Sequence, residues 1–100
     1  MYSYKYTKNL LKILQKLKNK NRKSFENVIA EIRKIRNDPT VGKPLTHRLK
    51  NFRRIHVNKS FVLVYQFRDD YIVFVDYDHH DNIYRKGQIF DDGDLITIDG

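Results

Sequence analysis

Apolar and polar positions in the second half of the chain follow the two-residue period of β-strands. Phe52–Asn58 alternates, Phe61–Phe67 is almost continuously β-branched or aromatic, and Tyr71–Asp78 repeats that pattern until acidic residues enter. A continuous apolar run of this kind is typical of a strand buried on both faces. The breaks at residues 58–60 and 68–70 are turn-rich and short enough for two hairpins. The three runs therefore predict an antiparallel meander.

The first half of the chain begins with a short alternating run and then changes to a helical period. Tyr2–Tyr6 predicts a short strand, and Thr7 is a suitable N-cap for a helix over residues 8–20. A second helix is expected to begin near residues 22–24 and to end by Asp38, because a proline follows. Each helix has an apolar stripe with basic residues opposite. The stripes are Leu10, Leu11, Ile13, Leu14 and Leu17 in the first helix and Phe25, Val28, Ile29, Ile32 and Ile35 in the second.

The resulting order is β-α-α-β-β-β, an α+β fold in which two N-terminal helices pack on one face of an antiparallel sheet. The chain has 100 residues, and we expect a single domain over residues 1–87. Residues 41–51 are expected to form a loop. Residues 88–100 form an acidic extension, which we interpret as either an edge strand or a mobile tail.

Charge is distributed unevenly along the chain. Residues 1–60 carry 17 Lys/Arg against 3 Asp/Glu, whereas residues 61–100 carry 3 against 9. A basic excess of this size favours binding to polyanions and points to nucleic acid as a partner. With no cysteine, neither a disulfide framework nor a thiolate zinc site is expected. No signal peptide or membrane-length apolar run is recognisable, so we expect a cytoplasmic protein without a membrane partner.

Side chains suited to acid–base and phosphate chemistry occur at the margins of the predicted sheet. Arg54 and His56 should share a face, because strand side chains repeat every two residues. If the third strand continues far enough, Asp76, Asp78 and His80 should share a face too, with the neighbouring His79 on the opposite one. Histidines and arginines at strand ends on a basic chain suggest a site for RNA phosphate and base.

The expected loop supplies further cations. Loops held by a rigid sheet often carry functional groups, so Lys43, His47, Arg48 and Lys50 are candidates for phosphate contact. For His47 alone, a solvated linker position is the favoured interpretation.

An ordered set of short motifs over residues 2–85 resembles the toxins of the RelE/ParE superfamily of bacterial and archaeal toxin–antitoxin pairs. The pattern is most similar to the YafQ branch, in which a histidine precedes an aromatic residue by four positions near the C-terminus, and the Arg-Arg-Ile segment is similar to YoeB. The motifs are Pro44-Leu45-Thr46, Phe52-Arg53-Arg54-Ile55-His56, Val62-Leu63-Val64-Tyr65 and His80-Asp81-Asn82-Ile83-Tyr84.

The resemblance implies an mRNA interferase that cleaves RNA without metal or cofactor. In this family the ribose 2′-hydroxyl attacks the neighbouring phosphate, which requires a base, an acid and cations around the phosphate. His80 and His56 would form the acid–base pair, since the ordinary pKa of histidine lies near 6.5. The resemblance further implies that Arg54 or Arg53 binds phosphate, and Arg54 is favoured because it shares a face with His56. Tyr84 and Phe61 would contact the substrate.

Two positions depart from the YafQ pattern. Lys43 stands where a further histidine is expected and could replace it as a cation, whereas Ser60 stands in place of an aspartate and cannot act as a base. The resemblance also implies mRNA, the ribosome and a cognate antitoxin as partners. The acidic extension could fold over the basic site as a brake.

Alternatives remain open at this point. The chain could be a non-catalytic ParE-like toxin that inhibits gyrase, or a general RNA-binding module using its aromatic sheet. Asp76, Asp78 and His80 could converge on a manganese or zinc ion. The basic helix over residues 8–20 could lie on a membrane or in a partner groove, although its leucines are needed in the core of so small a domain.

Overall fold

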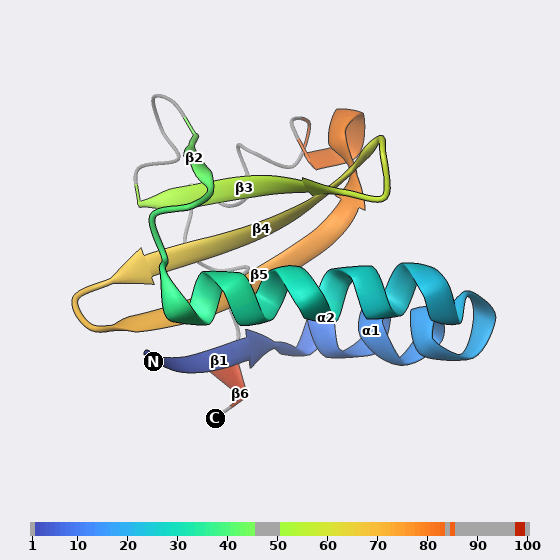
Figure 1. The fold of residues 1–100 in the computed structure, drawn as a ribbon, viewed down its shortest axis with the longest axis horizontal. Helices are drawn as coiled ribbons and strands as arrows, with labels where there is room; N and C mark the ends of the chain where they lie inside the picture. Colours follow the sequence, from blue (N-terminus) through green and yellow to red (C-terminus); the bar gives the residue numbers. More distant parts are fainter. Residues whose placement is uncertain (1, 46–50, 84, 86–97, 100) are drawn as a thin grey trace.

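The structure is a computed structural model that describes residues 2–45, 51–83, 85 and 98–99. The chain begins with β1 (Ser3–Thr7), α1 (Lys8–Lys20) and α2 (Arg22–Asn37). Next come the short strand β2 (Lys43–Pro44), then β3 (Phe52–Val57), β4 (Phe61–Arg68) and β5 (Tyr71–His79), and finally β6 (Ile98–Asp99). Helices on one face of a mostly antiparallel sheet confirm the predicted α+β fold (Figure 1).

Among the described residues the strands form one sheet in the order β2-β3-β4-β5-β1-β6. β3, β4 and β5 are antiparallel neighbours, which confirms the predicted meander. β1 is the exception to the antiparallel expectation, because it runs parallel to β5, with Ser3 opposite Tyr71. The helical hairpin returns the chain to the far edge of the sheet, and this crossover makes the parallel pairing possible.

Two parts of the chain differ from, or add to, the sequence prediction. Lys43–Pro44 pairs with Arg53 and Arg54, so the segment expected to be a loop contains a short edge strand. β6 pairs with β1, placing Ile98–Asp99 of the acidic extension at the opposite edge. The domain limit at residue 87 and the tail alternatives stay predictions, because most of the extension lies outside the described residues.

The helices begin and end where the sequence indicates. The Thr7 hydroxyl accepts a hydrogen bond from the Leu10 N–H (3.1 Å) and donates one to the Val75 carbonyl (2.7 Å), so it caps α1 and ties it to the sheet. The Asn21 side chain accepts from the Ser24 N–H (3.1 Å) and caps α2 in the same way. Pro39 follows the end of α2 closely, as expected.

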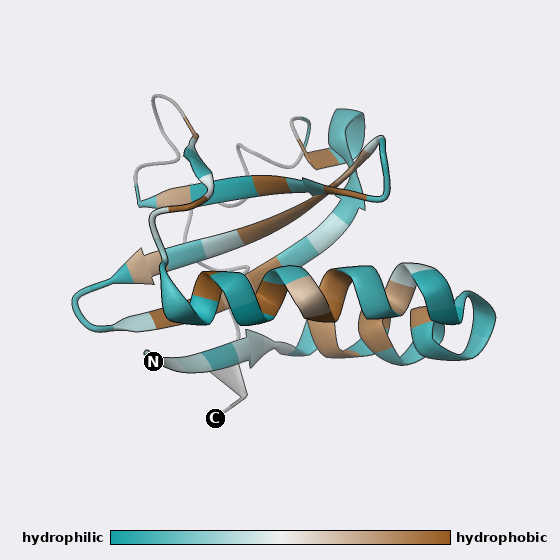
Figure 2. Cartoon of the chain, in the orientation of Figure 1, coloured by the Kyte–Doolittle hydropathy of each residue, from teal (hydrophilic) through white to brown (hydrophobic). Residues whose placement is uncertain are grey.

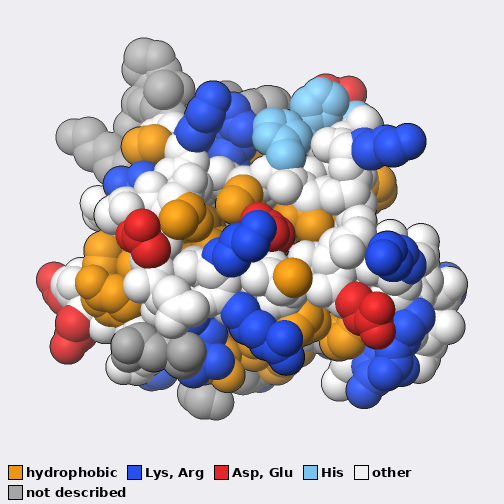
Figure 3. Space-filling model, in the orientation of Figure 1, with side chains coloured by type: hydrophobic (Ala, Val, Ile, Leu, Met, Phe, Trp, Pro, Cys, Tyr) orange, Lys and Arg blue, Asp and Glu red, His pale blue; other side chains and the backbone are white. Residues whose placement is uncertain are grey.

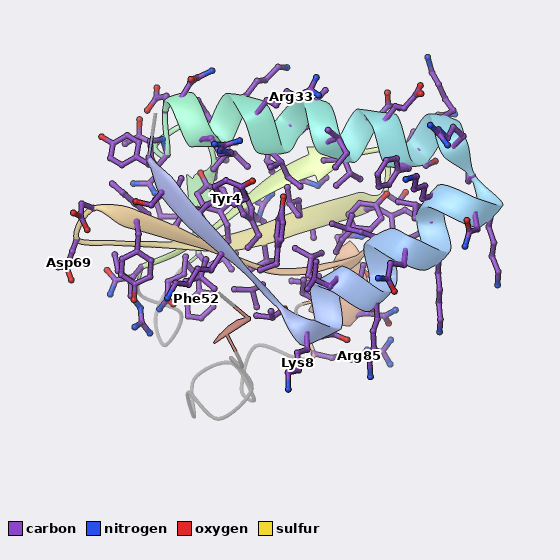
Figure 4. All side chains as sticks on the ribbon, turned by 90° about the horizontal axis from the view of Figure 1, so that it is seen from below. Tyr4, Lys8, Arg33, Phe52, Asp69 and Arg85 are labelled. Carbon is purple, nitrogen blue, oxygen red and sulfur yellow. The ribbon has the colours of Figure 1, made fainter. Side chains whose placement is uncertain are left out.

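The apolar stripes of α1 and α2 cover one face of the sheet and form the main core. Leu10, Val28 and Ile35 are fully buried there against strand residues such as Leu63 and Phe74. Figure 2 shows apolar positions alternating with hydrophilic ones along α2. In Figure 4, Tyr4 lies between β1 and α2, Arg33 points outward from α2, and Phe52 lies on the other side of the sheet.

The second face of the sheet carries a smaller core. Its buried members include Phe52, Val62, Val64 and Ile83, so residues after β5 fold back onto this face. The two cores together bury Tyr65, Val73 and Val75, and Phe67 packs at the edge of the first. Neither described helix is long and apolar enough to cross a membrane.

Candidate active site

The first part of the candidate site is a row of cations on the face of β3 opposite the helices. Arg54 Nη1 lies 3.3 Å from His56 Nδ1, which confirms the predicted shared face. The register of β2 sets Lys43 opposite Arg54. These three side chains line an open hollow of about 250 Å³ together with Val41 and Ile55. The face therefore combines two permanent cations with one titratable ring.

Gly42 and Tyr65 hold the short strand that carries Lys43. The Gly42 N–H donates to the Tyr65 hydroxyl (2.9 Å), which in turn donates to the Pro39 carbonyl (2.7 Å). A Cβ at position 42 would lie 2.6 Å from the Tyr65 oxygen and 3.0 Å from the Arg54 carbonyl oxygen. Only glycine allows this close approach, so the buried tyrosine fixes where the cation of Lys43 lies.

The second part of the site is the chain reversal at the end of β5. The strand ends at His79, and residues 80–83 form a helical turn. The Asp78 carboxylate accepts from the His79 N–H (2.7 Å) and the Asn82 side-chain amide (3.1 Å), and His79 Nδ1 accepts from the Asp81 N–H (3.2 Å) in the first turn. The His80 N–H donates to the Ser60 carbonyl (2.9 Å), so the β3–β4 turn holds the start of the helical turn.

The expectation that His79 and His80 point to opposite faces is wrong. Alternation stops where the strand stops, and the two ring centroids lie only 4.6 Å apart. Asp81 lies beside both rings, with His79 Nδ1 3.7 Å and His80 Nε2 3.4 Å from its carboxylate oxygens. Both histidines are partly exposed, and Figure 3 shows histidine side chains gathered at one edge of the molecule with Lys or Arg beside them.

The two parts of the site are electrostatically coupled. The His56 side chain is exposed, but its partial withdrawal from water lowers its pKa below the ordinary value, and the charges of Arg54, His80 and Lys43 lower that pKa further. Of the predicted site residues, the fold brings together Arg54, His56 and Lys43 on one face. The Ser60 carbonyl holds the backbone of His80 at the same end of the sheet, where β3 ends and β4 begins.

Two predicted substrate contacts lie elsewhere. Arg53 points to the helix side, where its Nη1 donates to the Gly42 carbonyl (2.7 Å) and supports β2. Phe61 also faces the helix side of the sheet. Its ring is 38% exposed and stacked on Tyr77 at a centroid distance of 5.3 Å. It borders a mostly apolar hollow of about 320 Å³ between α1 and the end of the sheet.

Several predicted residues cannot be placed. Tyr84, His47, Arg48 and Lys50 lie outside the described residues, so their proposed contacts stay predictions. The sequence analysis did not identify the residues that support the site, which are Gly42, Asn58 and Ser60 through its carbonyl.

Of these, only Asn58 has a residue type that points to its role. Asparagine favours the left-handed backbone of tight turns, and the φ of Asn58 is 57°.

The predicted metal trio of Asp76, Asp78 and His80 is not what the fold brings together. The Asp76 side chain is 1% exposed, and its Oδ1 accepts from the Asn9 amide (3.1 Å) and the Tyr77 N–H (2.8 Å). Because β5 ends at His79, His80 leaves the strand face that Asp76 and Asp78 follow. In the described part of the chain, the group with metal-ligand spacing is His79, His80 and Asp81.

Comparison with known proteins identifies the family. The family model for the ParE toxin of the type II toxin–antitoxin system parDE matches residues 4–84. A Methanocaldococcus jannaschii protein named "Putative toxin RelE4" is 40% identical over 94 residues, covering 92% of this chain and all of the relative. A Methanosarcina mazei protein of no described function is 35% identical over 86 residues, covering 84% of this chain and all of that protein.

Solved structures share the fold at low sequence identity. A YoeB/ParE toxin from Agrobacterium tumefaciens has a TM-score of 0.72 at 13% identity, covering 78% of this chain and 98% of that one. YafQ from E. coli has a TM-score of 0.68 at 19% identity, covering 84% and 99%. The sequence matches and the shared fold agree: the chain belongs to the RelE/ParE superfamily of toxins from type II toxin–antitoxin systems.

Proposed function

We propose that this toxin is an endoribonuclease that cleaves mRNA on the ribosome and thereby inhibits translation. The observation that carries the proposal is that Arg54, His56 and Lys43 share one face of the sheet, while the Ser60 carbonyl holds the backbone of His80 at the same end of the meander. Membership of the superfamily implies a cognate antitoxin as partner. The mRNA, the ribosome and a cytoplasmic setting are parts of the proposal.

The proposed reaction is attack of a ribose 2′-hydroxyl oxygen on the adjacent phosphorus. The 2′ proton goes to a base, the bond to the 5′ oxygen breaks, and that oxygen receives a proton from an acid, leaving a cyclic phosphate and a 5′-hydroxyl. No metal or cofactor is needed, because two imidazoles supply both proton transfers. Cations stabilise the charge that develops on the phosphate.

Local charge suggests which histidine has which role. The neighbours that act on His56 are cations and His80, and its lowered pKa keeps the ring neutral near pH 7, as a base requires. His80 is the other histidine of the pair, with the Asp81 carboxylate 3.4 Å from its Nε2. We therefore assign His56 as the base and His80 as the acid.

Arg54 has a double role in this mechanism. Arginine can only donate, so its 3.3 Å contact makes His56 Nδ1 the acceptor and holds that lone pair unprotonated. When substrate phosphate attracts the guanidinium, the lone pair becomes available to the 2′-hydroxyl. Lys43, opposite Arg54 across β2 and β3, would hold the same phosphate from the other side of the hollow.

The test is to induce the wild-type chain and a His56→Ala, His80→Ala double variant in cells and map the ends of cellular mRNA. We expect translation-dependent cuts at defined codon positions from the wild type and none from the double variant. Equal cleavage by both chains would refute the assignment of the pair. No cleavage by either, with RNA binding retained, would indicate a binding module instead.

The match to the ParE family model favours one second candidate, a non-catalytic toxin that inhibits gyrase. Such a toxin has no use for the histidine pair. DNA supercoiling by purified gyrase in the presence of this chain distinguishes the candidates: inhibition of supercoiling without RNA cleavage would establish the second.

A further inference from the structure

The turn after β5 gathers three potential metal ligands from consecutive residues. One ligand atom from each of His79, His80 and Asp81 lies within 4.8 Å of the other two. Around a zinc ion with bonds of about 2.0–2.2 Å, tetrahedral ligands are separated by roughly 3.3–3.6 Å. His79 Nδ1 lies 3.7 Å from Asp81 Oδ2 and His80 Nε2 lies 3.4 Å from Asp81 Oδ1, so each imidazole nitrogen is close to that spacing from one carboxylate oxygen.

The ligands are held by their backbones and remain open to solvent. Asp78 and the Ser60 carbonyl bind the N–H groups of His79 and His80, so the backbone that carries both rings is held in place. Their side chains are nevertheless 38% and 40% exposed, and that of Asp81 is 71% exposed. An ion from solution can therefore reach the turn without rearrangement of the core.

The hydrogen bonding already leaves one imidazole in the form that binds metal. The Asp81 N–H donates to His79 Nδ1 (3.2 Å), which requires an unprotonated nitrogen there. A metal ion would exchange this weak donor for a coordinate bond. The Phe61 ring, 5.8 Å from the His79 ring and nearly perpendicular to it, limits the rotation of that imidazole.

We propose that His79, His80 and Asp81 bind one Zn²⁺ ion, and that the ion inhibits the toxin by occupying His80. Two imidazoles and a carboxylate are ligands that suit Zn²⁺, with a fourth position left for water. An imidazole nitrogen bound to zinc cannot donate a proton to a leaving oxygen. The metal site stands on the turn geometry alone, whereas the inhibition rests on the proposed ribonuclease function.

Binding is measured with the purified full-length chain by calorimetric titration with Zn²⁺ and by the visible absorption of Co²⁺. We expect one ion per chain and at least a roughly tenfold weaker affinity in His79→Ala and Asp81→Asn. Asp81→Asn is nearly isosteric, so it guards against loss of fold in the alanine variant. His56→Ala is the matched control, because it removes a nearby histidine outside the trio and should bind as wild type does.

Inhibition is measured as mRNA cleavage on ribosomes with and without Zn²⁺, with His56→Ala as the background. Wild type should lose cleavage as zinc saturates the site and regain it when a chelator is added. His79→Ala keeps both proposed catalytic histidines and should cleave like wild type but resist zinc.

Each contrary result has one meaning. Wild-type affinity in both trio variants, or no ion bound, overturns the site. Zinc binding at the trio without any effect on cleavage overturns the inhibition. Zinc binding at the trio in a chain that never cleaves RNA leaves the site standing and contradicts the proposed function.

Discussion

His56 is the residue whose surroundings most directly connect structure to proposed chemistry. It sits beside Arg54 and lines the same hollow as Lys43, with the charge of His80 also acting on it. A histidine in a strand is usually structural or simply exposed. Here its partial withdrawal from water, together with the neighbouring charges, gives it a specific property, a pKa below the ordinary value.

That property predicts the pH dependence of cleavage. As a base, His56 must be neutral, so activity is lost as the pH falls through its pKa. Because this pKa is lowered, the acidic limb of the pH–activity profile should lie at a lower pH than for an ordinary histidine. Arg54→Gln removes one lowering charge and should move the limb upward, while also reducing the rate. The measurement is kcat/KM against pH for both chains; a limb that does not move in the variant would contradict the assignment.

Gly42 offers a test of how Lys43 is positioned. A Cβ here would meet the Tyr65 hydroxyl at 2.6 Å, so Gly42→Ala should destabilise the fold by about 1–3 kcal/mol through overpacking. Denaturant unfolding measures the change. Val41→Ala is the control, because that side chain is 44% exposed and its removal should change the free energy of unfolding little. Equal stability of the Gly42 variant and wild type would show that the Tyr65 contact does not constrain β2.

At the scale of elements, the spacing of apolar residues predicted those helices and strands that depend on neighbouring residues in the sequence. The two helices, their caps and the meander follow from apolar spacing and from Thr7 and the proline after α2. The parallel pairing of β1 with β5 joins residues 68 positions apart, such as Ser3 and Tyr71, and no local pattern encodes it. The Gly42–Tyr65 contact could not be predicted from the sequence, because these two residues are also far apart along the chain.

The candidate site was predictable only where it lies within a strand. Arg54 and His56 share a face by alternation, whereas His79 and His80 do not obey it, because β5 ends at His79 and a helical turn over residues 80–83 follows. An acidic residue before two histidines does not by itself reveal where a strand ends. Lys43–Pro44 is too short for a strand to be recognised from its sequence.

The β3–β4 turn connects both halves of the site. Asn58 Nδ2 donates to the Ser24 carbonyl (3.1 Å) and the Tyr77 hydroxyl (2.9 Å), and its Oδ1 accepts from Asn27 (2.7 Å). His56 lies two residues before it, and Ser60, whose carbonyl binds the His80 N–H, lies two residues after. The turn is therefore anchored to α2 and sets the relative position of the two histidines.

Asn58→Ala should lower the free energy of unfolding by about 2–3 kcal/mol, because it removes these hydrogen bonds and places alanine at a positive φ. The variant should also lower kcat for the cleavage of ribosome-bound mRNA, with a smaller change in KM. Asn58→Gly is the matched variant: it removes the same amide without the φ penalty, so it should recover part of the stability. Wild-type kcat in both variants would show that the turn does not position the histidines.

At the scale of the whole molecule, positive charge is concentrated in residues 1–60, which include the helices, β2 and β3. Binding of RNA by a cleavage-deficient His56→Ala, His80→Ala chain should weaken steeply with salt, because cations released from phosphate drive it. If Lys43 contacts phosphate, Lys43→Gln should reduce the slope of log K against log salt by about 0.7. Lys23→Gln, at the start of α2, is the control and should leave the slope unchanged; equal effects of both would mean that the hollow is not a specific phosphate site.

The central claim is that two histidines, one in the first strand of the meander and one just after its third strand, form one acid–base pair. Its most direct test is the single-turnover rate of ribosome-bound mRNA cleavage by wild type beside His56→Gln, His80→Gln and the double variant. We expect each single change to reduce the rate by about 10²–10⁴-fold and the double change to cost less than the product of the two. Wild-type rates in either single variant would contradict the account.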